Sequence, residues 1–427
     1  MAGLALSALG VLAAEPLYLL FDTAVVGRLG AVPLAGLAVG SLLLALAGSG
    51  ATFLSYGTTA RAARYFGAAD RPAAVGEGVQ AAWFALGLGG LTIVVGQAAA
   101  VPVVSAIAGD PVVAAAAMPW LRIAILGVPA ILVSLAGNGW MRGVQDTVRP
   151  LRYVVVGFGL SALLCPLLVY GWLGAPRMGL AGSAVANLAG QWVAALLFGK
   201  ALLDEGVSLR LHAAVLRAQL VMARDLILRT LAFQACYVSA AAVAARFGAA
   251  ALAAHQIVLQ LWMFLALILD SLAIAAQSLV GAALGAGDVA HAKWVAWRVS
   301  AFSLLAAGLL AGALAVGSTV LPGLFTNTAS VLAAIEVPWW FLVAQLPCAG
   351  VVFALDGVLL GAGDAAFMRT ATVVSALVGF LPLIWLALAY GWGLAGIWAG
   401  LSVFVVLRLV FVGWRTLSGR WAVTGTA

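Results

Sequence analysis

Four acidic residues of this 427-residue chain lie inside long apolar stretches: Glu15, Asp22, Asp270 and Asp356. In a membrane span, a charged side chain costs at least about 2.5–3.5 kcal/mol on insertion scales, so such residues usually face a cavity and have a function. Burial disfavours the charged form of a carboxyl group, whereas a nearby cation favours it. A buried acid can therefore load and release a proton near neutral pH. These positions predict proton or cation binding.

Glu15 and Asp22 are separated by two helical turns, so an α-helix places them on one face. We predict that Asp22, together with Glu15, couples the protein to a proton gradient. The alternative is a structural carboxylate, held by hydrogen bonds from Thr23 or from a neighbouring helix.

Asp270 and Asp356 have two interpretations. Their carboxylates can attract a cationic substrate or a cation, or they can accept hydrogen bonds between helices. Both interpretations stay open at the level of the sequence.

Four further polar residues are candidates for a substrate or cation cavity. Arg122 either pairs with a membrane acid or extends to the outer surface. Asn138 and Asn187 either line the cavity or join helices. His255 either titrates at about pH 6.5 or packs as a hydrogen-bonded side chain.

These residues need a scaffold, and the composition indicates a membrane-spanning one. Apolar residues make up 65% of the chain and charged residues 8%, against about 25% charged residues in soluble domains. A span needs roughly 20 apolar residues. The charge-free stretches and their Gly-rich breaks predict twelve helices, at 4–27, 33–60, 76–102, 114–137, 150–172, 178–200, 223–246, 250–277, 294–318, 330–355, 370–390 and 394–415.

Basic residues predict the orientation of these helices. If residue 1 starts in the cytoplasm, seventeen of the 21 Lys and Arg residues belong to cytoplasmic segments and three, Arg28, Arg177 and Arg246, to outer loops. We therefore expect both termini in the cytoplasm, and we separately predict a monomer in a bacterial inner membrane. This bias accounts for the net charge of +7 without nucleic-acid binding, which needs a basic soluble surface.

An internal repeat organises the chain. Three motifs recur in the second half at one constant spacing, and a fourth, Tyr-Gly-Trp at 170–172 and 390–392, recurs with a drift of two. The three begin at Arg28 and Arg246, at Gly67 and Gly285, and at Gly139 and Gly357. An offset of six helices gives both copies the same membrane orientation, an arrangement suited to alternating access. The predicted fold is an all-α polytopic membrane protein of two parallel six-helix repeats: a lobe at 1–200, a cytoplasmic linker at 201–222 and a lobe at 223–427.

The acids do not follow the repeat. The same spacing pairs Asp22 with Ala240 and Asp356 with Asn138. The two lobes are thus predicted to be structural copies with chemically different sites.

Several motifs resemble those of multidrug and toxic compound extrusion (MATE) transporters of the DinF-like branch. The resemblance is carried by residues 15–30, by 142–147 with Pro150, by 253–257 and 269–277, and by 355–357 with 361–364. It implies a twelve-helix, two-lobed exporter of small molecules, driven by a proton or sodium gradient, in which the acid matching Asp22 is the proposed proton site.

Two departures from the family pattern bear on the mechanism. Ser7 stands where the family commonly has a proline that is linked to bending of the first helix. Ser161 and Cys165 stand where relatives often carry Asn and Asp on the fifth helix. We therefore expect Asp22 to lack two hydrogen-bond partners and expect no proton relay through that helix.

Other functions are weighed by motif. The sequence contains no H-E-x-x-H or G-x-S-x-G motif, and its three His are dispersed, which argues against an enzyme or a metal site. No cofactor is expected beyond the proton gradient, with sodium possible. The rival function is a lipid or lipid-linked sugar flippase of the same superfamily. Such relatives often have extra helices and cationic cavities, whereas twelve spans and a net acidic cavity are predicted here.

Overall fold

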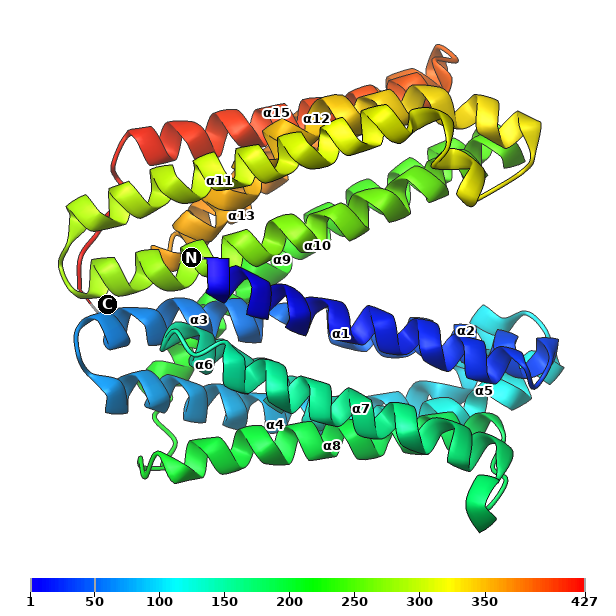
Figure 1. Ribbon diagram of the computed structural model, residues 1–427, viewed down its shortest axis with the longest axis horizontal. Helices are drawn as coiled ribbons and strands as arrows, with labels where there is room; N and C mark the ends of the chain where they lie inside the picture. The colour runs from blue at the N-terminus through cyan, green and yellow to red at the C-terminus, as the bar shows by residue number, and fades with distance from the viewer. Residues whose placement is uncertain (1, 50, 426–427) are drawn as a thin grey trace. The chain divides into compact units, whose positions relative to one another are not determined.

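The fold is all-α, and the structure, a computed structural model, describes residues 2–49 and 51–425. The first half contains the helices α1 to α8 and two short 3₁₀ turns, η1 and η2 (Figure 1). Their bounds are α1 Ala2–Gly27, α2 Ala31–Ser49, α3 Thr52–Gly67, α4 Arg71–Ala108, α5 Pro111–Ala124, η1 Ile125–Gly127, α6 Val128–Gly143, α7 Val148–Tyr170, η2 Trp172–Gly174 and α8 Leu180–Asp204.

The second half continues with long helices (Figure 1), and it also contains a π-helical segment, η5. Its elements are α9 Ala213–Arg246, α10 Ala249–Gly285, α11 Val289–Val316, η3 Gly317–Thr319, η4 Pro322–Leu324, α12 Ala329–Gly361, α13 Ala365–Val374, η5 Ser375–Phe380, α14 Leu381–Ala389 and α15 Gly393–Leu417.

Within the described residues, eleven helices are long and apolar enough to cross a membrane, and a shorter apolar helix covers Ala31–Leu46. The predicted polytopic α-helical fold is therefore confirmed. The predicted helix 33–60 corresponds to α2 and α3, and residue 50 between them lies outside the described residues. The predicted helix 114–137 is interrupted by η1, because Pro129 has no amide hydrogen to donate to the carbonyl of Ile125.

The chain forms two compact units, one over Leu6–Ala223 and one over Arg224–Ala427 with the N-terminal residues up to Ala5. In the first unit α6 packs against α3, α4 and α8, and in the second α12 packs against α10, α11 and α15. The spacing of the sequence repeat maps the C-terminal half of α12 onto α6, so each unit is organised around the equivalent helix.

The repeat is visible in the backbone of the turns. Ala69 and Gly287, which occupy equivalent positions of the repeat, both have left-handed φ angles, of 61° and 78°. In the next residue of each turn, Asp70 accepts a hydrogen bond from Ala73 N and Asp288 accepts one from His291 N. Each aspartate thus caps the helix that follows, which explains why this short motif recurs.

Glycines set the closest helix contacts at equivalent places in both units. A Cβ added to Gly139 would lie 2.8 Å from Ser55 O, and one added to Gly357 would lie 2.2 Å from Ala273 O. One turn later, Gly143 and Gly361 make similarly close approaches. Small residues four apart let the helix backbones meet, as is common in membrane bundles.

Candidate functional site

Asp22 is buried in α1 of the first unit, with 1% of its surface exposed. Its two carboxyl oxygens accept hydrogen bonds from different helices: Ser183 Oγ of α8 at 2.9 Å and Cys165 Sγ of α7 at 3.2 Å. Trp120 Nε1 of α5 in turn donates to Ser183 Oγ at 3.3 Å. The carboxylate is therefore held by a network of neutral donors.

Close packing of α7 and α8 brings these donors to Asp22. A Cβ on Gly190 would lie 2.0 Å from Ser161 Oγ, and one on Gly182 would lie 2.6 Å from the backbone of Leu168. Without side chains at these glycines, the two helices approach closely enough to present Cys165 and Ser183 together. The burial and packing of α1 then place its acid against both.

The expectation that Asp22 lacks two hydrogen-bond partners, at Ser161 and Cys165, is wrong for Cys165. Cys165 donates to the carboxylate itself, and Ser183, which sequence reasoning did not consider, supplies the second bond. Ser161 is fully buried one turn before Cys165. Thr23 does not hold Asp22 through its hydroxyl, because that group donates to Leu19 O at 2.7 Å.

Glu15 does not share the environment of Asp22, although the two lie on one helix face. Glu15 and both residues that follow it are exposed, whereas Asp22 is buried. Helical spacing fixes the direction of a side chain, but burial depends on which helices pack beside it. The structure therefore does not bring the predicted pair into one site.

The remaining candidates of the first unit are dispersed. Asn187 lies one turn after Ser183 on α8, is buried, and accepts a hydrogen bond from Gln191 Nε2 at 3.4 Å. Asn138 is buried in α6, and its Oδ1 finds no hydrogen-bond partner among the described residues. Arg122 is exposed in the last turn of α5 and has no part in the ion pairs found within residues 2–49 and 51–425. Its position suits an extended side chain better than a buried pair.

Asp356 is the centre of an ion-pair cluster in the second unit. Its Oδ2 accepts from Arg229 NH2 of α9 at 2.7 Å and also from Arg408 NH2 of α15. The side chains of Asp356 and Arg408 are each 6% exposed, and that of Arg229 is 16% exposed. Two cations around one anion give the cluster a net charge of +1.

Aromatic rings complete the cluster. The guanidinium carbons of Arg408 and Arg229 lie 4.9 and 5.3 Å from the centroid of Phe233, a distance at which a cation is attracted to a ring face. The rings of Phe404 and Phe233 meet edge to face, with their centroids 5.6 Å apart. The charge of Asp356 is thus already compensated, and the hydrogen-bonding interpretation of this acid fits the structure.

Sequence reasoning missed the arginines of this cluster. It counted Arg229 and Arg408 among cytoplasmic residues, whereas the structure places both within span helices, with Arg408 buried and Arg229 half-buried. The sequence did contain a sign that these arginines lie inside the membrane spans, because both positions fall within the predicted helices 223–246 and 394–415.

The last two candidates lie elsewhere in the second unit. Asp270 is half-buried in α10. His255 is 2% exposed, and its ring packs against Trp398 with centroids 5.8 Å apart. Neither ring nitrogen of His255 has a hydrogen-bond partner among the described residues. In the described part of the chain, no three His, Cys, Asp or Glu residues gather as metal ligands.

Comparison with known proteins identifies related sequences. The sequence pattern of the MatE family matches residues 8–167 and 226–386. DNA damage-inducible protein F of Escherichia coli is 31% identical over 427 residues, covering 95% of this chain and 90% of that protein. Protein DETOXIFICATION 44, chloroplastic, of Arabidopsis thaliana is 35% identical over 313 residues, or 72% of this chain and 59% of that protein. The chain spans between 52% and 59% of the length of four such Arabidopsis relatives.

Solved structures share the fold. A MATE protein crystallised in a bent conformation has a TM-score of 0.88 and 22% identity, over 98% of this chain and 94% of that one. An outward-facing multidrug resistance transporter gives a TM-score of 0.82 at 22% identity, over 98% and 93% of the two chains. These matches agree with the resemblance found in the sequence motifs.

Proposed function

Because this chain belongs to the MATE family of transporters, we propose that it exports small cationic or amphipathic organic compounds in exchange for protons, by alternating access of its two repeated units. The family relation and the eleven candidate spans make it a multi-pass membrane protein. We further propose a monomer in a bacterial inner membrane with cytoplasmic termini, and the lobe and linker boundaries given above.

The contrast between two buried acids carries the proposal. Asp356 is compensated by two arginines, so adding a proton to it would leave one buried and one half-buried cation without their anion. Among the described residues, Asp22 accepts only from a hydroxyl and a thiol, and it takes no part in the ion pairs found there. Asp22 can therefore gain or lose a proton without disrupting an ion pair, which favours it as the coupling residue.

The hydroxyl beside Asp22 suits both protonation states. Ser183 Oγ donates to the charged carboxylate and accepts from Trp120 Nε1. A hydroxyl has two acceptor lone pairs, so Ser183 can also accept a hydrogen bond from protonated Asp22. The indole N–H of Trp120 holds this oxygen in place in either state. Proton transfer thus needs little movement of the helices that carry these groups.

The substrate class follows from the same contrast. With Asp356 compensated, Asp22 is the buried acid best able to respond to a bound cation, since either a proton or a cationic substrate can satisfy its charge. Competition between the two would give exchange. We propose Asn187, one turn from Ser183, and Asn138 as polar cavity residues that accompany this exchange, and leave Glu15 a secondary role at an exposed position.

A second candidate function is favoured by the cluster around Asp356. A net positive, aromatic-lined site suits an anionic group, as a flippase of lipid or lipid-linked sugar would need. The prediction of a net acidic cavity argued against a flippase. In the second unit this argument no longer holds, because Arg229 and Arg408 make the cluster around Asp356 net positive. This function would use the second unit for the anionic headgroup of its substrate.

Substrate-driven proton movement separates these functions. The protein is reconstituted in liposomes that contain a pH-sensitive dye, and a cationic dye, an anionic lipid or sodium is added. The proposal expects proton movement on addition of the cationic dye, with no need for sodium. Proton movement with the anionic lipid alone would favour the flippase. Transport that needs sodium but no pH gradient would show sodium coupling and contradict proton coupling.

A further inference from the structure

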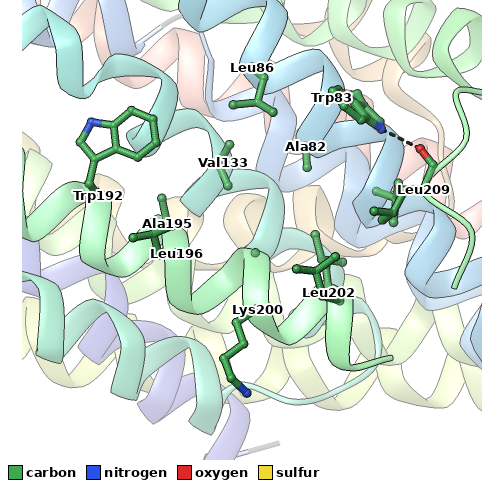
Figure 2. Close-up of a pocket in the computed structure, with 13 residues that line it drawn as sticks. Ala82, Trp83, Leu86, Val133, Trp192, Ala195, Leu196, Lys200, Leu202 and Leu209 are labelled. Atoms are coloured by element: carbon green, nitrogen blue, oxygen red, sulfur yellow. Dashed lines mark hydrogen bonds between the residues drawn. The ribbon is translucent and has the colours of Figure 1, made fainter. Parts of the chain in front are cut away.

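A cavity of about 450 Å³ lies in the first unit between α4, α6 and α8 (Figure 2). Its wall consists of apolar side chains and Gly199, apart from Lys200 at its edge. The lining residues include Trp83 and Leu86 of α4, Trp192, Leu196 and Gly199 of α8, and Leu209 of the linker. The cavity is thus separate from the buried network around Asp22.

Two tryptophans give this cavity fixed walls. Trp83 Nε1 donates to Leu209 O at 2.9 Å, and Trp192 Nε1 donates to Leu126 O at 3.2 Å. The two residues nevertheless remain 43% and 38% exposed. Because both indole N–H groups already donate to backbone carbonyls, the two side chains present only apolar ring surface to a ligand. The bond to Leu209 also ties the linker across one end of the cavity.

The position of the cavity indicates an occupant from the bilayer. α4 and α8 are both candidate membrane spans, and Leu86 and Leu196 of the wall are 41% and 65% exposed. Pockets that orient polar ligands contain a few placed polar groups, and the interior of this one presents only apolar side chains. An acyl chain meets this requirement and is present at high concentration around such helices.

The edge of the cavity carries positive charge. Lys200 is 72% exposed and points away from the apolar wall (Figure 2). Its partner Asp204, at 2.8 Å, is 62% exposed, and ion pairs on a surface are weak enough to exchange partners. Arg210, exposed and next to Leu209, belongs to the linker that crosses one end of the cavity. Basic residues at a cytoplasmic membrane surface attract anionic lipids.

We propose that this cavity binds one anionic phospholipid, with an acyl chain between Trp83 and Trp192 and the phosphate at Lys200. The lipid would fill the space between α4 and α8 and contact the linker at Leu209. The lipid would therefore connect the spans α4 and α8 to the linker that leads into α9. The proposal depends on the membrane setting of the helices and not on the identity of the exported compound.

Gly199 allows a test that spares the fold. A Cβ added at this position meets no atom within 4 Å, so the backbone here accepts a side chain, and Gly199→Phe places a ring in the space that the acyl chain would take. Replacing a glycine inside a helix also removes an unfavourable residue. The matched control is Gly87→Phe, on an exposed position of α4 that is equally open and does not line the cavity.

The experiment uses the full protein in vesicles of phosphatidylcholine that contain phosphatidylglycerol with a photoreactive acyl chain. Cross-links are mapped by mass spectrometry. We expect them at wall residues such as Leu86 and Leu196, and about tenfold fewer in Gly199→Phe, since losing contact with two methylenes weakens binding by that factor. Gly87→Phe should label like the native protein. Equal labelling of Gly199→Phe, or labels spread over all lipid-facing positions, would overturn the proposal.

Two further arms identify the ligand. Lys200→Gln should lower labelling by photoreactive phosphatidylglycerol but leave labelling by the phosphatidylcholine analogue unchanged. If neither changes, the headgroup assignment is wrong. If an exported cationic dye displaces the label at the wall, the cavity belongs to the substrate, and the lipid proposal fails.

Discussion

Replacement of Asp356 by Ala should destabilise the second unit more than replacement of any exposed acid. Asp356 and Arg408 are each 6% exposed at their side chains and Arg229 is 16% exposed. Removing the shared anion leaves the buried guanidinium of Arg408 and the half-buried one of Arg229 without their partner, and breaking one buried pair costs about 3–5 kcal/mol. For a unit of this size, each kcal/mol lowers Tm by about 2–4 °C. We therefore expect Asp356→Ala to lower Tm by about 10 °C.

The measurement is thermal unfolding of the purified protein in detergent, followed by intrinsic fluorescence and by size exclusion after heating. Asp204→Ala is the matched control, since it also removes an acid from an ion pair, but one that is 62% exposed and contributes little. A triple variant, Asp356→Leu with Arg229→Met and Arg408→Met, should recover most of the lost stability because no buried charge remains. A Tm of Asp356→Ala within about 2 °C of the control would refute this account of the cluster.

Three other changes test separate parts of the structure. Ser183→Ala should preserve folding but shift the pH profile of transport, measured in liposomes, because the acid of α1 loses its hydroxyl donor; an unchanged profile would exclude this role. Gly357→Ala should lower Tm, with a cost of about 1–3 kcal/mol, because its Cβ would lie 2.2 Å from Ala273 O; an unchanged Tm would contradict the close contact. Glu77→Gln should speed proteolysis of the linker, since Glu77 holds both Arg61 and Gln219, and native resistance would argue against this tether.

Features that repeat along the chain, or that are locally conspicuous, could be predicted from the sequence. Equivalent turns at Ala69 and Gly287 were predictable from the repeat, because the same backbone geometry requires similar residues. Asp22 was predictable because an acid in an apolar stretch is conspicuous. The family resemblance followed from several such motifs in order.

Contacts between distant segments were not predictable. Ser183 and Cys165 lie far from Asp22 in the sequence but donate to its carboxylate, and their roles depend on how closely α7 and α8 pack. The charge rule that gave the orientation also hid Arg229 and Arg408, because it treats basic residues near helix ends as surface residues. Helical period placed Glu15 with Asp22, but the period does not say which neighbours cover a face.

Proton-driven export by the Asp22→Asn variant tests the central proposal most directly. The native protein and the variant are reconstituted at equal density in liposomes, a pH gradient is imposed, and export of a cationic dye is followed with binding of the dye measured in parallel. The account predicts that Asp22→Asn stays folded, binds the cationic dye more weakly and without dependence on pH, and no longer exports it in response to the gradient. Export of the dye by Asp22→Asn at the native rate under the same pH gradient would contradict the proton-coupling role of Asp22.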